Sequence, residues 1–443
     1  MFKRIYCPAV NFIAFAVCLN AFAEESWPTW RGPNGNGVSN AKGLPDRWSE
    51  TENIAWKTPL PSWSGSSPIV WGDKVFLMSP SKSNVDAAAE GRGKYSDPGG
   101  DSLLLLCISA KDGKVLWECE VAKGNALGRK GNNTSPSPIT DGKHVWVITG
   151  SGALAAVTMD GKVVWSKNIQ DEYGKFGLNF VYGSSPVLHD GKVFIQVLHG
   201  MKTDDPSYLA AFDALKGDLV WRVERPTDAI SETPDAYNTP ALLKVGDQMQ
   251  LIVCGGGFVS GHDLKDGKEI WRSFGLDPNR NEYYRTISSA VAVDGMVYAP
   301  TRQQPLLAVR ADGKGDVSAT HVAWKWDEPY GPDVPTAVCD GKYFYMVDDK
   351  GVATCTDAKT GKVIWGPEHT QKGPYSASPV LADGKLYFCN EAGVTTVLAA
   401  GPEFKVIATN TLDGEEHTLS SFAVSDGRLY LRTPSFLYCI GKG

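Results

Sequence analysis

The sequence lacks the compact motifs that mark common redox, haem and metal sites. Its nine cysteines form no Cys-x-x-Cys, Cys-x-x-Cys-His or adjacent pair, which removes the usual redox and c-type haem patterns. Its seven histidines form no His-x-His or His-Glu-x-x-His spacing, so zinc has little support. There is no Gly-x-Ser-x-Gly elbow and no Asp-x-Asp-x-Asp-Gly calcium loop. No catalytic, cofactor-binding or metal-binding residue can therefore be named from a motif.

Runs of basic residues and long apolar stretches are also missing from most of the chain. The formal net charge is −6 and no Lys/Arg run occurs, which argues against binding to a phosphate backbone. After residue 23 no stretch is apolar enough to span a membrane, and none has the period of an amphipathic helix. We expect an all-β protein that does not bind nucleic acid.

The first residues resemble an export signal. Lys3 and Arg4 precede an apolar segment, and Ala21-Phe22-Ala23 provides the small residues of a cleavage site. We expect residues 1–23 to be a signal peptide, with a membrane anchor as the alternative. The mature chain is then periplasmic or extracellular, not membrane-spanning, and expected to be monomeric.

Residues 24–47 form an N-terminal extension that is too rich in glycine, proline and asparagine for a regular element. Its tryptophans, Trp27 and Trp30, either pin it across the fold or contact a peptide or glycan.

The cysteines outside the leader are odd in number, because Cys7 and Cys18 fall within it. At least one thiol therefore stays unpaired or bonds to another chain. Cys107 and Cys119 flank one predicted hairpin turn, so a disulfide between them is one alternative. Burial as small apolar side chains is the other.

One unit recurs along the chain: a Ser/Thr-Pro start, an apolar run, an Asp-Gly or Gly-Asp turn, and further apolar runs that end near a tryptophan. The clearest copy begins at Ser378-Pro379. The first turns fall at Asp73, Asp141, Asp190, Asp247, Asp294, Asp340, Asp383 and Asp426. Most intervals are about 45 residues, which is typical of four-stranded propeller blades.

A Gly-x-x-x-Trp signature follows in phase with these turns, as in Gly113 to Trp117 and Gly361 to Trp365. The glycine permits a tight turn, and the indole provides a large surface for packing one blade on the next. The expected docking tryptophans are Trp56, Trp117, Trp165, Trp221, Trp271, Trp324 and Trp365.

Strand counting predicts a closed ring. The last unit, from Thr418 to the end, has three strands, and the segment around Trp56 supplies the missing fourth. We predict an eight-bladed β-propeller of four-stranded antiparallel blades over residues 48–443, closed by this N-terminal strand. Seven blades is the alternative, because the fifth unit is irregular and the seventh has no tryptophan.

The units resemble the PQQ (pyrroloquinoline quinone) repeat, Ala-x-Asp-x-x-Thr-Gly-x-x-x-Trp, best in the segment from Thr356 to Trp365. From Trp27 to Gly443 the chain is similar to the quinoprotein-like propeller proteins of bacterial envelopes, often grouped with the assembly factor BamB. That resemblance implies a scaffold without a cofactor. Quinoprotein dehydrogenases share the repeat and hold PQQ and Ca²⁺ over the axis, so both remain alternatives. Acidic pairs such as Asp348-Asp349 are interpreted as solvated turn residues.

In a propeller, the loops that precede the inner strands and those joining the second and third strands share one face. Polar and aromatic residues at these places could, as a set, clasp a peptide or sugar around the axial funnel. For any single one of them, packing against the neighbouring blade is the favoured alternative. The candidate funnel residues are Tyr182, Tyr237, Asn238, Tyr284, Arg285, Arg302, Gln303, Tyr375, Asn390 and His199.

These observations favour a non-catalytic binding or scaffolding propeller of the cell envelope, which offers loops or an open strand edge to a partner protein. A PQQ- and calcium-dependent oxidoreductase acting on alcohols or sugars is the first alternative. A glycan-binding propeller is the second.

Overall fold

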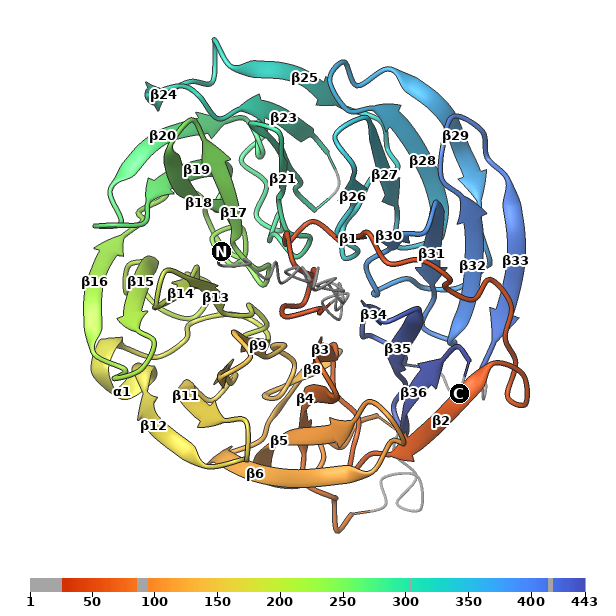
Figure 1. Cartoon of the computed structure of the whole chain (residues 1–443). Helices are drawn as coiled ribbons and strands as arrows, with labels where there is room; N and C mark the ends of the chain where they lie inside the picture. The colour runs from red at the N-terminus through yellow and green to blue at the C-terminus, as the bar shows by residue number, and fades with distance from the viewer. Residues whose placement is uncertain (1–25, 86–94, 303, 413–416, 443) are drawn as a thin grey trace, which may run out of the picture.

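The computed structural model of the chain describes residues 26–85, 95–302, 304–412 and 417–442. The predicted signal peptide and Gln303 lie outside these residues. Eight antiparallel sheets of at least four strands surround a central axis, as predicted (Figure 1). The chain is therefore an all-β, eight-bladed propeller, and the seven-bladed alternative is wrong.

The blades are numbered in chain order and their strands are given from the axis outwards. Blade 1 contains β3 (Ile69–Trp71), β4 (Lys74–Pro80), β5 (Ser102–Ser109) and β6 (Val115–Lys123), and blade 2 contains β9 (Ile139–Thr140), β10 (His144–Ile148), β11 (Ala153–Thr158) and β12 (Val163–Asn168). Blade 3 contains β13 (Val187–His189), β14 (Lys192–Val197), β15 (Tyr208–Asp213) and β16 (Leu219–Glu224), and blade 4 contains β17 (Ala241–Val245), β18 (Gln248–Gly255), β19 (Phe258–Asp263) and β20 (Glu269–Phe274).

Blade 5 contains β21 (Val291–Val293), β22 (Met296–Ala299), β23 (Leu306–Arg310) and β25 (Val322–Trp326), and blade 6 contains β26 (Val338–Cys339), β27 (Tyr343–Val347), β28 (Val352–Asp357) and β29 (Val363–His369). Blade 7 contains β30 (Val380–Ala382), β31 (Lys385–Cys389), β32 (Val394–Ala399) and β33 (Val406–Thr411), and blade 8 contains β34 (Ala423–Ser425), β35 (Arg428–Arg432), β36 (Phe436–Ile440) and β2 (Ile54–Pro59). Outside the blade order lie β1 (Val38–Ser39), β7 (Leu127–Gly128), β8 (Gly131–Asn132), β24 (Gly315–Asp316) and the helix α1 (Ile169–Tyr173).

The N-terminal strand closes the ring, as predicted. Strand β2 pairs antiparallel with β36, with Trp56 opposite Cys439 and Pro59 opposite Phe436. Both chain ends therefore contribute to blade 8, and the propeller has no open gap between its first and last blades.

Tryptophan side chains join neighbouring blades through one repeated contact. The indole N–H of Trp117 donates to the Met159 carbonyl of blade 2 at 3.1 Å, and a Cβ on Gly161 would stand 2.8 Å from the Trp117 ring. Only glycine leaves room for the ring there, which explains the Gly-x-x-x-Trp spacing: each glycine receives one tryptophan and each tryptophan docks on the following blade. The same indole-to-carbonyl bond crosses the seams at Trp56, Trp165, Trp221, Trp324 and Trp365.

Trp271 docks indirectly. Its indole N–H donates to Gln250 Oε1 of its own blade at 2.8 Å, and Gln250 Nε2 donates to the Ala311 carbonyl of blade 5 at 3.4 Å. At the same seam the turn of blade 5 is long, and from it β24 folds back and pairs with β20. The fifth unit is thus irregular in sequence because it carries an added strand.

Blade 7 has no docking tryptophan, and Trp48 serves at that seam instead. Its ring lies 6.3 Å from both Tyr387 of blade 7 and Phe422 before blade 8, and its backbone N–H donates to Asn410 Oδ1.

The seven described cysteines are buried free thiols, so Cys107 and Cys119 form no disulfide. Among the described residues, no helix is long and apolar enough to cross a membrane.

Candidate functional site

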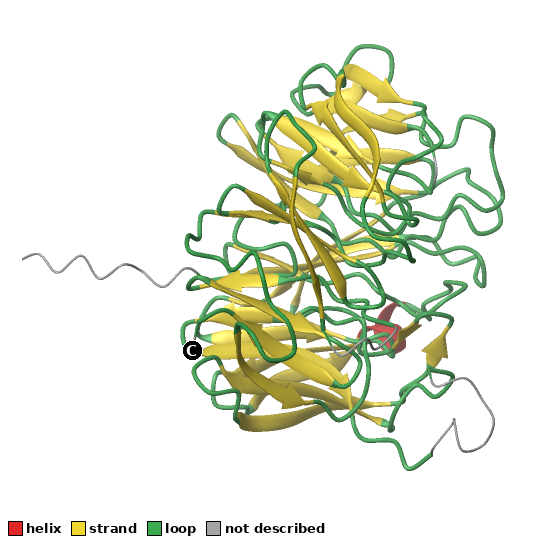
Figure 2. Cartoon of the chain, turned by 90° about the vertical axis from the view of Figure 1, so that its right-hand side faces the viewer, coloured by secondary structure: helices red, strands yellow, loops and turns green. Residues whose placement is uncertain are grey.

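The two ends of the ring carry different loops. Figure 2 shows the ring from the side, with α1 and long loops at one end; we call this the funnel end. The opposite end, where the turns between first and second strands lie, carries the N-terminal extension and is called the extension end.

Eight hydroxyl side chains form a closed hydrogen-bonded ring around the axis. Each stands just before the inner strand of its blade and accepts the backbone N–H of its counterpart in the preceding blade, at 2.9–3.0 Å. Its members are Ser67, Ser137, Ser185, Thr239, Ser289, Thr336, Ser378 and Ser421. The ring satisfies eight inner N–H groups that would otherwise be costly to bury. It explains the Ser/Thr start of each repeat.

The N-terminal extension closes the axis at its own end. Trp27 forms a β-bridge to blade 1, and β1 runs parallel to β30 of blade 7. Between them, the Arg31 guanidinium donates to the carbonyls of Pro379 and Ala337, each at 2.9 Å. Burial lowers the pKa of Arg31 to about 9, so the side chain stays charged at neutral pH. Sequence reasoning predicted that Trp27 pins the extension but missed Arg31.

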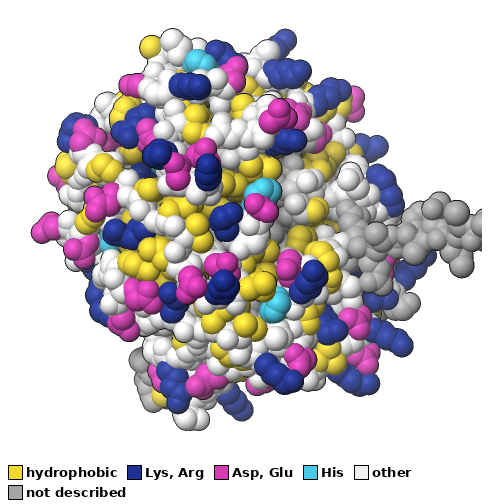
Figure 3. All heavy atoms as spheres, turned by 60° about the vertical axis from the view of Figure 1, so that its left-hand side comes forward, with side chains coloured by type: hydrophobic (Ala, Val, Ile, Leu, Met, Phe, Trp, Pro, Cys, Tyr) yellow, Lys and Arg dark blue, Asp and Glu magenta, His cyan; other side chains and the backbone are white. Residues whose placement is uncertain are grey.

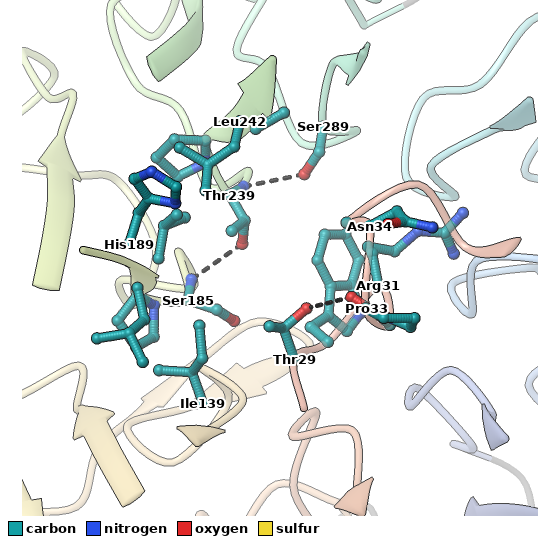
Figure 4. A pocket seen from close by; sticks show the side chains of 18 of the residues that line it. Thr29, Arg31, Pro33, Asn34, Ile139, Ser185, His189, Thr239, Leu242 and Ser289 are labelled. Atoms are coloured by element: carbon teal, nitrogen blue, oxygen red, sulfur yellow. Dashed lines mark hydrogen bonds between the residues drawn. The ribbon is translucent and has the colours of Figure 1, made fainter. Parts of the chain in front are cut away.

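A cavity of about 350 Å³ lies between the extension and blades 2–4 (Figure 4). Ile139 and Leu242 contribute apolar walls, and His189 and Asn34 stand at its sides. Its serine hydroxyls and that of Thr239 belong to the axial ring and already accept backbone N–H groups, and Thr29 Oγ1 donates to the Gly32 carbonyl at 3.0 Å. The cavity is therefore mainly an apolar space beside the closed end of the axis.

The funnel end is capped by the two-stranded hairpin β7–β8. Its two-residue tip consists of Arg129, with φ +56°, and Lys130. Lys130 Nζ lies 2.6 Å from Glu391 Oε1 of blade 7, while the Arg129 guanidinium lies 5.7 Å from the Phe180 ring before blade 3. A tip that reaches both blades lies over the axis. Apart from a glycine on each side of the tip, no sequence pattern predicts this hairpin.

Two carboxylates of blade 6 lie at the funnel mouth. Burial first, and Asp349 second, raise the pKa of Asp333 to about 7, while Arg285, Arg302 and Arg129 oppose that rise. Asp333 Oδ1 has no hydrogen-bond partner among the described residues, and its Oδ2 lies 3.9 Å from Arg302 Nε. Asp349 accepts the Val334 N–H at 3.0 Å, and burial raises its pKa. Asp349 is thus more enclosed than a solvated turn residue, and Asp333 titrates near neutral pH.

Five of the predicted funnel residues are buried and bonded within the protein. Tyr182 donates to the Gln196 carbonyl, Asn238 donates to the Cys254 carbonyl, and His199 Nδ1 accepts the Gly177 N–H. Tyr375 and Asn390 are also buried, and their side chains bond to neighbouring loop backbone. Burial lowers the pKa of His199, which keeps its ring neutral. These side chains hold the loops in place.

The remaining described candidates meet near the funnel mouth. Arg285 is buried and forms an ion pair with Glu232 at 3.2 Å. Tyr237 donates to Asp235 Oδ2 at 3.2 Å and accepts the Phe180 N–H. Arg302 donates to the Tyr283 carbonyl at 2.9 Å. Tyr284 is half-buried beside them.

The described residues offer no cluster of acidic side chains that would hold a calcium ion by itself. Calcium takes six to eight oxygen ligands, and no group of three His, Cys, Asp or Glu side chains able to hold a metal occurs in the part of the chain that the structure describes. At the mouth, Asp333 faces the guanidinium of Arg302, and the axial cavity of about 130 Å³ is lined mainly by serines and other small or apolar residues. The funnel chemistry suits polar or charged side chains of a ligand better than a metal.

Sequence comparison identifies the family of this propeller. A family model described as outer membrane protein assembly factor BamB matches residues 47–195, 104–366 and 316–417. The chain belongs to this BamB family. Among relatives of this BamB-family chain, BamB of Yersinia pestis is 21% identical over 83% of this chain and 82% of that protein. A polyvinylalcohol dehydrogenase of a Pseudomonas species is 23% identical over 77% of this chain but only 50% of its own length.

Solved structures show the same fold in proteins of both kinds. The quinohemoprotein alcohol dehydrogenase of Comamonas testosteroni matches with a TM-score of 0.66 and 13% identity, over 95% of this chain and 81% of that one. BamB of Moraxella catarrhalis matches with a TM-score of 0.56 and 15% identity, over 77% and 95%. At identities this low the likeness establishes only the propeller fold. The activity has to be argued from the residues of the site.

Proposed function

We propose that this BamB-family chain is a non-catalytic binding and scaffolding propeller of the bacterial cell envelope, and that its funnel-end loops bind a partner protein. The supporting observation is a platform of loops around the funnel mouth that is held rigid by its own hydrogen bonds while it exposes apolar side chains.

Three loops of the platform are tied together by short contacts. Asn179 donates through its backbone N–H to Asp235 Oδ2 at 2.7 Å, joining the loops before blades 3 and 4. The backbone N–H of Tyr284 donates to Thr233 Oγ1 at 3.0 Å, joining the loops before blades 4 and 5. A surface already ordered before binding loses little conformational freedom on binding.

Apolar side chains project from this platform. Tyr283 is 56% exposed, Met201 42%, Ile230 40% and Leu127 37%. Aromatic and aliphatic anchors with charged groups nearby are typical of protein interfaces. The paired charges of the mouth, Arg302 with Asp333 and Lys130 with Glu391, would orient such a partner.

The test is capture of a stoichiometric partner from envelope extract by the purified chain. Ile230→Asp is expected to abolish capture, because it places a charge in the apolar platform. Val406→Asp on the outer strand β33 is the matched control, since Val406 is exposed to a similar extent, 48%, and it should leave capture unchanged. Equal capture by both variants would count against the proposal.

A PQQ- and calcium-dependent oxidoreductase is the second candidate, favoured by the dehydrogenases among the relatives. Titration with PQQ and Ca²⁺, followed by dye reduction with alcohols and aldoses, distinguishes it. Saturable binding with substrate-dependent reduction would replace the scaffolding proposal. Glycan binding by the funnel, the third candidate, is tested on a glycan array.

A further inference from the structure

Blade 4 carries a fifth strand that the chain itself adds to the outer edge. Strand β24 pairs parallel with β20, with Gly315 opposite Trp271 and Asp316 opposite Arg272. The contact continues beyond β24, because the Val317 N–H donates to the Arg272 carbonyl and the Phe274 N–H donates to Ser318 Oγ, both at 2.8 Å. An outer blade edge of this protein is thus able to accept an extended, parallel segment.

The outer strand of blade 3 resembles β20 but lies open. It reads Leu219-Val220-Trp221-Arg222, against Glu269-Ile270-Trp271-Arg272 in blade 4. Ile270 is only partly exposed, whereas Val220 at the same position is 45% exposed; Leu219, where blade 4 has Glu269, is 41% exposed. The tryptophans that follow are buried in both strands. No strand pairs with the outer edge of β16 among the described residues. Figure 3 shows hydrophobic side chains lying between charged ones on this side of the ring.

An arginine distinguishes β16 from the other open edges. The residue after the docking tryptophan is arginine in β16 and β20, whereas β2 and β25 have lysine there and β6, β12 and β29 have Glu118, Ser166 and Gly366. Arginine presents a planar fork of donors that matches a carboxylate, which lysine does not. In blade 4, Asp316 of the added strand stands opposite Arg272; hydrogen bonds from Ser318, with a smaller contribution from Arg272, lower the pKa of Asp316. Arg222 is partly exposed and lies 4.4 Å from the Tyr208 ring. It provides β16 with the same positive charge at the same register.

We propose that the outer edge of β16 is a docking site for an extended segment of a partner protein, which adds as a parallel fifth strand with an acidic residue opposite Arg222 and an aliphatic residue directly after it. Backbone hydrogen bonds would supply the attachment, and the pairing of Arg222 with the acid would set the register. This surface lies on the rim, away from the funnel, and it goes beyond the proposed function of the funnel loops.

The test uses a synthetic peptide with the sequence of residues 312–320, in which a benzophenone photo-crosslinker replaces Ala319. After irradiation with the full chain, we expect adducts on residues 219–224. Replacing the peptide residue that corresponds to Asp316 by Lys should lower the yield about two- to fivefold, the range of one cross-strand pair. The change Val220→Lys should lower it similarly, because it places a charge on the apolar edge.

Val164→Lys on β12 is the matched control, since Val164 also directly precedes its docking tryptophan and is 43% exposed; it should leave the yield unchanged. Adducts spread evenly over the outer strands, adducts on the funnel loops, or equal labelling by the Lys peptide would overturn the proposal. If the two surfaces are independent, Val220→Lys should still capture the partner of the funnel loops. A negative crosslinking result at β16 therefore leaves the proposed function of the funnel loops open to its own test.

Discussion

The two ends of the axial channel use arginine in opposite ways. At the extension end, Arg31 is 3% exposed and gives its terminal nitrogens to two carbonyls of blades 6 and 7. At the funnel end, Arg302 is half-buried, makes one backbone bond and lies 3.9 Å from a carboxylate that lacks a partner on one oxygen. A buried charge whose terminal nitrogens are bonded to backbone stabilises one conformation, whereas partly bonded charges beside solvent remain available to a ligand. The contrast separates the end of the axis that internal contacts close from the end that we propose binds a partner.

The largest expected effect comes from removing the charge at the closed end. Arg31→Met keeps the apolar stem but leaves two buried carbonyls without donors, so we expect a loss of about 2–5 kcal/mol in the free energy of unfolding. Arg302→Met, at the funnel, should cost less than about 1 kcal/mol. Urea unfolding followed by tryptophan fluorescence measures both. Equal losses would remove the distinction between the two ends.

Glycine substitutions in the extension sharpen the same contrast. A Cβ on Gly37, whose φ is +78°, would lie 2.1 Å from Arg31 Nη2, while a Cβ on Gly35, with φ +66°, would meet nothing within 4 Å. Gly35→Ala should therefore cost about 1–2 kcal/mol for its left-handed backbone alone. Gly37→Ala should cost about 1–3 kcal/mol more, because the methyl group displaces the guanidinium. Comparing the thermal unfolding of the two variants isolates the contact between residue 37 and Arg31. Similar melting temperatures for both variants would contradict a tight contact there.

At the funnel end the expected effect on stability depends on pH. Because the pKa of Asp333 is raised to about 7 in the folded protein, the folded state binds the proton more tightly than the unfolded state. Stability should therefore fall as pH rises from about 4 to about 7 and stay level above that. In Asp333→Asn this fall, on the order of 1–2 kcal/mol for a partly exposed carboxyl, should shrink. Unfolding midpoints at pH 5 and pH 8 measure it, and identical pH slopes in both proteins would refute the assignment.

The ring was predictable because its signals repeat along the sequence. Each Asp-Gly turn and each Gly-x-x-x-Trp marks a local feature, so the eight units and their closure through Trp56 follow from reading the chain. Of the seven predicted docking tryptophans, six bond directly to the next blade. The contact of Trp271 could not be predicted in detail, because its partner Gln250 lies on another strand of its own blade and no local pattern marks that glutamine.

The site was less predictable for a physical reason. Residues just before an inner strand lie where the backbone crosses near the axis, and carbonyl groups there need donors. Asn238 and Tyr182 therefore bond to backbone, although the same residue types at the same places suggest ligand binding. Asp333 stands out only through its burial and its arginine neighbours, which come from other blades.

The smallest expected effect concerns the hairpin β7–β8 over the funnel. Lys130 is half-exposed while its partner Glu391 is mostly buried, so Lys130→Met should change global stability by less than about 1 kcal/mol. The hairpin, however, reaches blade 7 through this ion pair, and its loss should speed amide hydrogen exchange at residues 127–132 without affecting the blades. Lys175→Met, which breaks an exposed ion pair with Asp171 on α1, should leave that exchange unchanged. If Lys130→Met also leaves it unchanged, packing of Gly128 and Gly131 on Val181 holds the hairpin instead, and the funnel end is as firmly closed as the end that Arg31 seals.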